Sequence, residues 1–129
     1  MKYSRAFTVI EILFIAVIIG IASIFFFIQK NDIAMAARDD TRKISINAMY
    51  YSLEEVYYEK EGHYPQTLTS ETLPSVDAEL FTDPLGSLLG ESDSDYRYEP
   101  TGCKDSACSS YTLRASMESE DDFVRESRH

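Results

Sequence analysis

The sequence predicts an α+β fold, in which one long N-terminal helix packs on a small antiparallel β-sheet head. Three observations support this. Residues 7–28 are almost entirely apolar, and as a helix rising 1.5 Å per residue they would be roughly 33 Å long, about the thickness of a bilayer core. Residues 29–61 contain neither Pro nor Gly and keep a helical spacing of apolar side chains. Further on, residues 96–99 and 111–117 alternate as strands do.

The first half of the helix, residues 7–29, is predicted to span a membrane. Glu11 is its one charged residue. A carboxylate at that depth costs a few kcal/mol, which a plain membrane anchor does not explain. Lys2 and Arg5 precede the apolar run and favour a cytoplasmic N-terminus. The run is too long for a cleaved secretory signal, and no small-x-small site directly follows it.

The second half, residues 30–62, is predicted to be amphipathic. Its apolar stripe consists of Ile46, Met49, Tyr50, Leu53, Val56 and Tyr57, and its solvent face is expected to carry Glu54, Glu55, Glu59 and Lys60. Gly62 can take the left-handed conformation that ends helices, and Pro65 cannot continue one. We therefore expect the helix to end at this point.

Residues 63–117 are predicted to form a globular head with a small sheet. Turn residues dominate positions 66–90, and this loop is expected to be anchored by Leu68, Leu73, Val76, Leu80 and Phe81. His63, beside the helix end, is interpreted as a structural or solvated residue. Residues 118–129 are acidic and then mixed in charge, and we predict a disordered tail.

The only two cysteines, Cys103 and Cys108, lie in the segment between the predicted strands. With His63 and His129 as the only histidines, a four-ligand zinc site is not expected. A disulfide is the favoured interpretation, and it implies an oxidising compartment outside the cytoplasm.

The charge of the chain argues against nucleic acid as a partner. Residues 31–129 contain 9 Lys and Arg and 21 Asp and Glu, a net charge of −12. Such a surface repels polyanions.

The N-terminal segment AFTVIEILFIAVIIGI, residues 6–21, resembles the prepilin motif of type IV pilins and type II secretion pseudopilins. That motif joins a basic leader, here residues 1–6, to a small residue, Phe-Thr-x-x-Glu and a long apolar helix. The resemblance implies that a prepilin peptidase cleaves between Ala6 and Phe7 and methylates the new amine of Phe7. It also implies that Glu11 pairs with the N-terminus of a neighbouring subunit during filament assembly.

The resemblance extends over the head, where EGHYP, DPLG and YRYEP match small pilins and pseudopilins. It implies a type IV pilin-like fold and a structural subunit of a homo-oligomeric helical filament. The implied partners are membrane lipids, the prepilin peptidase, an inner-membrane platform and an assembly ATPase that acts indirectly. The subunit would be a single-pass membrane protein before assembly, with its head extracytoplasmic, and would then enter a periplasmic or extracellular filament.

Which filament this is stays open: a major or minor pilin of a pilus for adhesion or twitching motility, a DNA-uptake fibre, or a secretion pseudopilus. Some pseudopilins bind calcium near the segment that here contains Glu91, Asp93 and Asp95. These alternating carboxylates are weak calcium candidates, because the turn glycine and the closing Glu of an EF-hand loop are absent. A solvated loop is the favoured interpretation, and no other cofactor is expected.

Catalysis is not expected, since the sequence contains no metalloprotease His pair, no nucleophile elbow and no phosphate-binding glycine loop. The alternative to a filament subunit is a monomeric, membrane-anchored extracytoplasmic binding domain. That alternative accounts for the apolar segment, the cysteines and the acidic head. It gives no role to Glu11.

Overall fold

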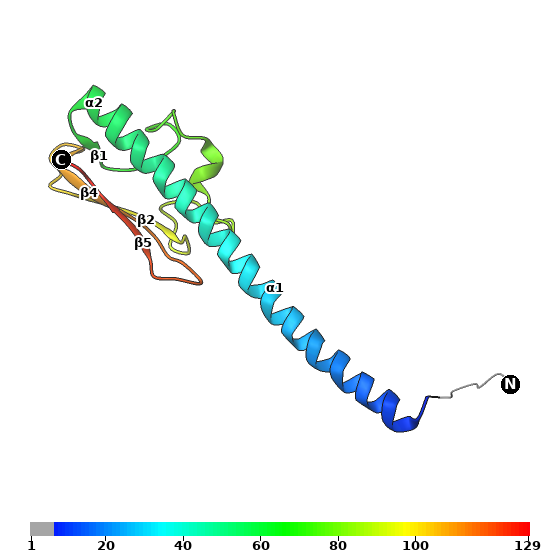
Figure 1. The fold of residues 1–129 in the computed structure, drawn as a ribbon. Coiled ribbons are helices and arrows are strands. Elements are labelled where there is room, and N and C mark those ends of the chain that lie inside the picture. The colour runs from blue at the N-terminus through cyan, green and yellow to red at the C-terminus, as the bar shows by residue number, and fades with distance from the viewer. Residues whose placement is uncertain (1–6) are drawn as a thin grey trace. The chain divides into compact units, whose positions relative to one another are not determined.

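A computed structural model describes residues 7–129 and divides the chain into two compact units, Met1–Ala34 and Met35–His129. Helix α1, Val9–Ser52, begins in the first unit and ends in the second (Figure 1). A π-helical turn, Leu53–Tyr57, and the short helix α2, Tyr58–Glu61, continue it. The helix ends as predicted, because Gly62 takes the left-handed conformation with φ 73° and donates its N–H to the Tyr58 carbonyl.

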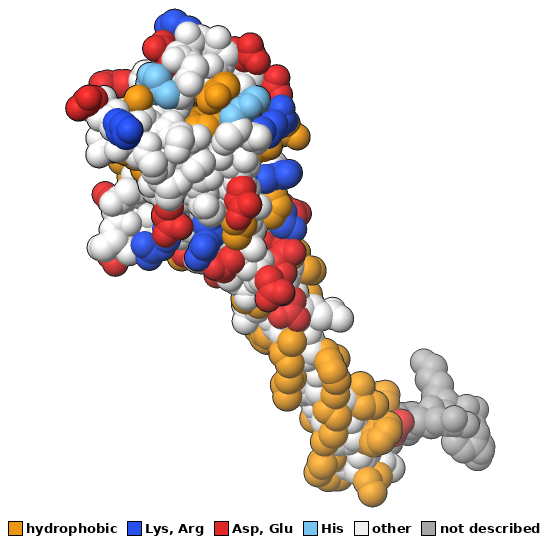
Figure 2. All heavy atoms as spheres, turned by 90° about the vertical axis from the view of Figure 1, so that its left-hand side faces the viewer, with side chains coloured by type: hydrophobic (Ala, Val, Ile, Leu, Met, Phe, Trp, Pro, Cys, Tyr) orange, Lys and Arg blue, Asp and Glu red, His pale blue; other side chains and the backbone are white. Residues whose placement is uncertain are grey.

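In the first unit, the described part of the helix has no buried side chain. It is long and apolar enough to cross a membrane. Figure 2 shows hydrophobic side chains covering this part of the helix. Such a surface is unfavourable in water, so this segment requires a lipid or protein environment.

The second unit contains two small antiparallel sheets. Strands β2, Tyr96–Thr101, β4, Ser110–Ala115, and β5, Phe123–Glu126, form a sheet in the order β2-β4-β5. Strand β1, Tyr64–Pro65, pairs with β3, Ala107–Cys108. In Figure 1 the strands lie on one side of the helix and the loop segment after β1, including the 3₁₀ turn Ala78–Phe81, lies on the other.

The core of the second unit joins the helix, the loop and the sheets. Its buried hydrophobic side chains are Ile46, Met49, Tyr50, Leu53, Tyr64, Leu68, Leu73, Val76, Phe81, Tyr96, Cys108, Tyr111, Leu113 and Ala115. The α+β prediction is confirmed in its coarse form. Four of the five loop anchors are buried and Leu80 is half-buried, as the sequence predicted.

Two predictions about residue placement are wrong. Glu54 was expected on the solvent face but is 3 % exposed, and Val56 was expected in the stripe but is 50 % exposed. Both lie in the π-helical turn, whose wider spacing changes the direction of each side chain.

The prediction of a disordered tail over residues 118–129 is also wrong. Strand β5 pairs with β4 over four residues, and Arg125 donates from Nε to the Asn47 side chain at 3.0 Å. The acidic turn before β5 is neutralised by the helix, where Arg38 and Arg42 pair with Glu118 and Lys43 pairs with Glu120. Acidic composition therefore does not prevent folding here, since the helix provides cations at the matching positions.

Candidate assembly site

The start of helix α1 carries the residues that the sequence analysis assigned to processing and assembly. Ala6 lies outside the described residues. Phe7 is 66 % exposed and precedes the helix by two positions. Glu11 lies in the first helical turn and is exposed, where a carboxylate also interacts favourably with the helix dipole.

Thr8 caps this helix, and the sequence analysis missed its role. The backbone N–H of Glu11 donates to the Thr8 side-chain oxygen at 3.4 Å and to the Thr8 carbonyl at 3.0 Å. Thr8 and Glu11 have the spacing of a capping box, in which a Glu or Gln at this position assists the cap. The Thr-x-x-Glu pattern was visible in the sequence. In a capping box the Glu side chain assists the start of the helix, which would be a local role for Glu11 independent of assembly.

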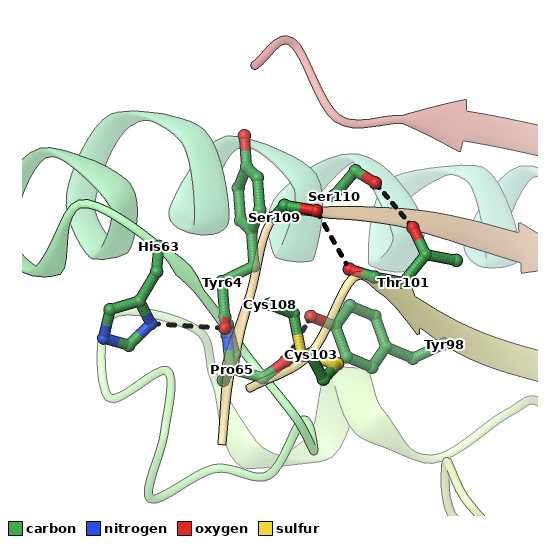
Figure 3. Close-up of a disulfide and its surroundings, with 9 residues drawn as sticks. All are labelled: His63, Tyr64, Pro65, Tyr98, Thr101, Cys103, Cys108, Ser109 and Ser110. Atoms are coloured by element: carbon green, nitrogen blue, oxygen red, sulfur yellow. Dashed lines mark hydrogen bonds between the residues drawn. A yellow bond between two sulfur atoms is a disulfide. The ribbon is translucent and has the colours of Figure 1, made fainter. Parts of the chain in front are cut away.

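The disulfide joins Cys103 to Cys108 and closes a hairpin at the end of the β2–β4 connection (Figure 3). Lys104 and Ala107 exchange two backbone hydrogen bonds of 2.8 and 3.0 Å. The two residues between them, Asp105 and Ser106, are left-handed, with φ of 49° and 71°. Such conformations are unfavourable for residues with a Cβ, and the disulfide and the paired flanks hold them in place.

This hairpin also connects the sheet to the end of the helix. Through β3 it pairs with β1, and the Tyr98 hydroxyl donates to the Pro65 carbonyl at 2.6 Å. His63 lies beside β1 with its Nδ1 3.3 Å from the Tyr64 carbonyl (Figure 3). In the described structure, the contacts of the hairpin and of His63 therefore hold neighbouring elements together.

The three weak calcium candidates do not converge. Asp95 forms an ion pair with Arg42 at 2.6 Å, and the Glu91 carboxylate accepts the backbone N–H of Leu88 at 2.8 Å. Asp93 is exposed. Nowhere in residues 7–129 do three or more His, Cys, Asp or Glu residues come together as metal ligands would.

A buried ion cluster centred on Arg42 lies at the start of the second unit, and the sequence did not predict it because two of its partners, Asp95 and Glu118, are far away in the chain. The fully buried guanidinium pairs with Asp39 at 2.8 Å, Asp95 at 2.6 Å and Glu118 at 3.0 Å. Burial alone would raise the pKa of Asp39, but hydrogen bonds from Ser119, Glu118 and Arg42 outweigh it and lower that pKa. Hydrogen bonds from Arg38 and Arg42 lower the pKa of Glu118 to about 2.

A second buried carboxylate, Glu54, joins the helix to both sheets. It accepts hydrogen bonds from the hydroxyls of Tyr64 at 3.0 Å and Tyr111 at 2.8 Å, and from the backbone N–H of Arg128 at 3.2 Å. Burial, and then the hydrogen bond to Glu54, raise the pKa of both tyrosines. These neutral donors explain how a carboxylate is accommodated in the core. Its role in the described structure is to hold the elements together.

The fold and its N-terminal site define an α+β protein whose head is stapled by a disulfide and whose single N-terminal helix is long enough to span a membrane. The chain matches no protein-family model, no curated protein and no solved structure.

Proposed function

We propose that this chain is a pilin or pseudopilin, a structural subunit that is cleaved before Phe7, N-methylated and polymerised into a filament. The observation that carries the proposal is a single carboxylate, Glu11, in the first turn of a helix that is otherwise uncharged and exposed over residues 9–29. After cleavage, the new amine of Phe7 would lie about one helical turn from this carboxylate. In an apolar bundle each charge needs a partner, and the amine of a neighbouring copy is one.

The disulfide supports an extracytoplasmic head, because such bonds persist in oxidising compartments. A head outside and a basic leader inside correspond to a single-pass precursor held by residues 7–29. Polymerisation would bury the exposed apolar helices against one another.

One observation favours the alternative, a monomeric membrane-anchored binding domain. Thr8 and Glu11 have the spacing of a capping box, in which the Glu side chain assists the start of the helix without a second copy. A substitution of Glu11 must therefore distinguish a role in capping from a role in assembly.

The experiment compares Glu11→Gln with Glu11→Ala in full-length precursor expressed with a pilus or pseudopilus assembly system. Gln keeps the size and capping ability of Glu and removes only the charge. Breaking a buried ion pair costs about 3–5 kcal/mol, so we expect both variants to be cleaved to Phe7, by intact mass, yet to give few or no filaments by electron microscopy. Glu11→Asp should give an intermediate number. Asp32→Asn, which removes an exposed carboxylate from the same helix, is the control and should assemble normally.

Normal filament numbers from Glu11→Gln together with a loss in Glu11→Ala would assign Glu11 to capping. A mature protein that still starts at Met1 would contradict processing and filament assembly together.

A further inference from the structure

The charges of the second unit are distributed unevenly. Residues 62–96 contain seven Asp and Glu and no Lys or Arg. Four of these acids have contacts within the chain. Asp83 is buried and accepts three backbone N–H bonds, and Asp95 pairs with Arg42. Glu91 accepts the Leu88 N–H and lines the same pocket as Arg97, and Asp93 accepts the Ser92 hydroxyl. The three exposed acids of the loop after β1 form what we call the acidic loop side: Glu71, Asp77 and Glu79.

The outer face of the three-stranded sheet carries the opposite charge at one end. Side chains alternate along the strands, and Tyr96 and Leu113 are among those that face the core. On the other face, Arg97 lies directly opposite Arg114, and Arg114 lies directly opposite Val124. We call these three residues the arginine line; Figure 2 views the head from this side. Two like charges at directly opposite positions destabilise a sheet, so the line carries a cost in the isolated subunit.

The arginine line has little compensation from its own chain. Within residues 7–129, no carboxylate lies within 4.0 Å of Arg97, and Arg114 reaches only Glu99, at 4.0 Å. The Nε of Arg114 is buried without a hydrogen-bond partner. Asp122 and Glu126, the nearest acids along β5, form no ion pair with the line. Val124 adds a side chain that is 41 % exposed. Arg is among the residue types enriched at protein–protein interfaces.

We propose that the arginine line binds the acidic loop side of a second copy of this chain. This rests on the proposed function, because a filament is what brings copies together. A helical filament needs a heterologous contact, in which two different patches of one molecule fit each other. The strands and the loop lie on different sides of the helix (Figure 1), and their charges are complementary. The contact would also offset the repulsion between heads that each carry a net charge of −12 over residues 31–129.

The first test is Arg97→Glu in the full-length precursor, with Lys104→Glu as the matched control. Both cations are exposed and neither forms an ion pair among the described residues, so the two changes alter net charge equally. Arg97→Glu should not harm the fold, since it places opposite charges across the strands. We expect roughly tenfold fewer filaments from Arg97→Glu than from Lys104→Glu, because rim charges of reversed sign repel.

The second test locates the partner surface directly. A photo-crosslinking amino acid at Val124, in filaments mixed from ¹⁵N-labelled and unlabelled protein, should yield labelled–unlabelled crosslinks to peptides within residues 62–96. Crosslinks only within one chain, only to other peptides, or none at all would overturn the proposal. Equal filament numbers from Arg97→Glu and Lys104→Glu would also overturn it and leave the proposed function standing. Absence of filaments from the unmodified chain, in contrast, would remove the proposed function itself.

Discussion

Asp39 joins the helix to the segment that follows β4 through hydrogen bonds. Its carboxylate accepts the backbone N–H groups of Glu118 at 2.9 Å and Ser119 at 2.8 Å, and the Ser119 hydroxyl at 2.6 Å. It also pairs with the fully buried Arg42. Removing it would leave a buried cation and two backbone donors with fewer partners.

We therefore predict that Asp39→Ala destabilises the protein by about 3 kcal/mol, the range measured for breaking a buried pair. Asp40→Ala is the control, since Asp40 is the next residue along the helix and is exposed. It should change the free energy of unfolding by less than about 0.5 kcal/mol. Urea unfolding in detergent measures both. Equal effects of the two variants would contradict the role of Asp39.

The same cluster predicts how stability depends on pH. The pKa of Asp39 lies below its ordinary value of 3.8, and that of Glu118 falls from 4.5 to about 2. Groups with a lowered folded-state pKa stabilise the protein above the unfolded pKa, and this contribution is lost as pH falls through the folded value. The contribution of these two groups to stability should thus be constant from about pH 7 to 5 and decrease as pH falls below about 4.5. Asp39→Asn should make the free energy of unfolding depend less on pH in this acidic range, whereas Asp40→Asn should not. Urea unfolding at each pH measures both. An unchanged pH dependence in Asp39→Asn would contradict the role of Asp39.

At the scale of elements, β5 is an edge strand of the sheet. Its backbone N–H groups point alternately to β4 and to the free edge. Ser127 donates its N–H to the Tyr111 carbonyl at 3.1 Å, and Arg125 lies opposite Leu113. In an antiparallel ladder every second residue bonds to the neighbouring strand. The N–H of Arg125 therefore points to β4, and those of Val124 and Glu126 point to the free edge.

We predict that backbone amides exchange hydrogen more slowly at Arg125 and Ser127 than at Val124 and Glu126, by at least about tenfold, because only ladder hydrogen bonds protect them. NMR-detected exchange in detergent measures this pattern. Uniformly fast exchange over residues 118–129 would support the disordered tail that the sequence predicted and contradict β5.

The elements that the sequence predicted correctly are those set by local signals. The apolar length of the helix, the left-handed Gly62 and the alternation in β2 and β4 each depend on neighbours in the chain. Glu54 and the tail were predicted wrongly because their placement depends on partners far away in sequence, such as Tyr111 for Glu54 and Asp39 for the tail. Acidic residues look solvent-exposed by composition alone, and only the fold reveals the donors and cations that face them.

For the candidate site the situation is similar. Phe7 and Glu11 were identified by a spacing of residues, and Thr8 had a visible capping pattern with the same Glu. The arginine line could not be predicted, because it is set by the register of three strands, and periodicity within one strand does not give the register between strands.

For the whole molecule, the two units differ in their surroundings: the second has a core of its own, and the first needs an apolar environment. Among residues 7–129, the buried hydrophobic residues all lie from Ile46 to Ala115, and the cluster around Arg42 begins at Arg38. Neither uses a side chain before Met35. The first unit, in contrast, exposes its apolar helix and needs lipid or other copies.

We therefore predict that a chain starting at Met35 folds as a water-soluble monomer with the Cys103–Cys108 disulfide formed. Its free energy of unfolding should lie within about 1 kcal/mol of the full chain's head in detergent, because residues 7–34 contribute no buried side chain. Adding Asp39→Ala should lower it by the same ~3 kcal/mol as in the full chain, since the cluster is retained. Light scattering, near-ultraviolet circular dichroism and urea unfolding measure these outcomes. An aggregated product, or one without fixed tertiary packing, would contradict this prediction and show that folding of the head depends on the apolar helix.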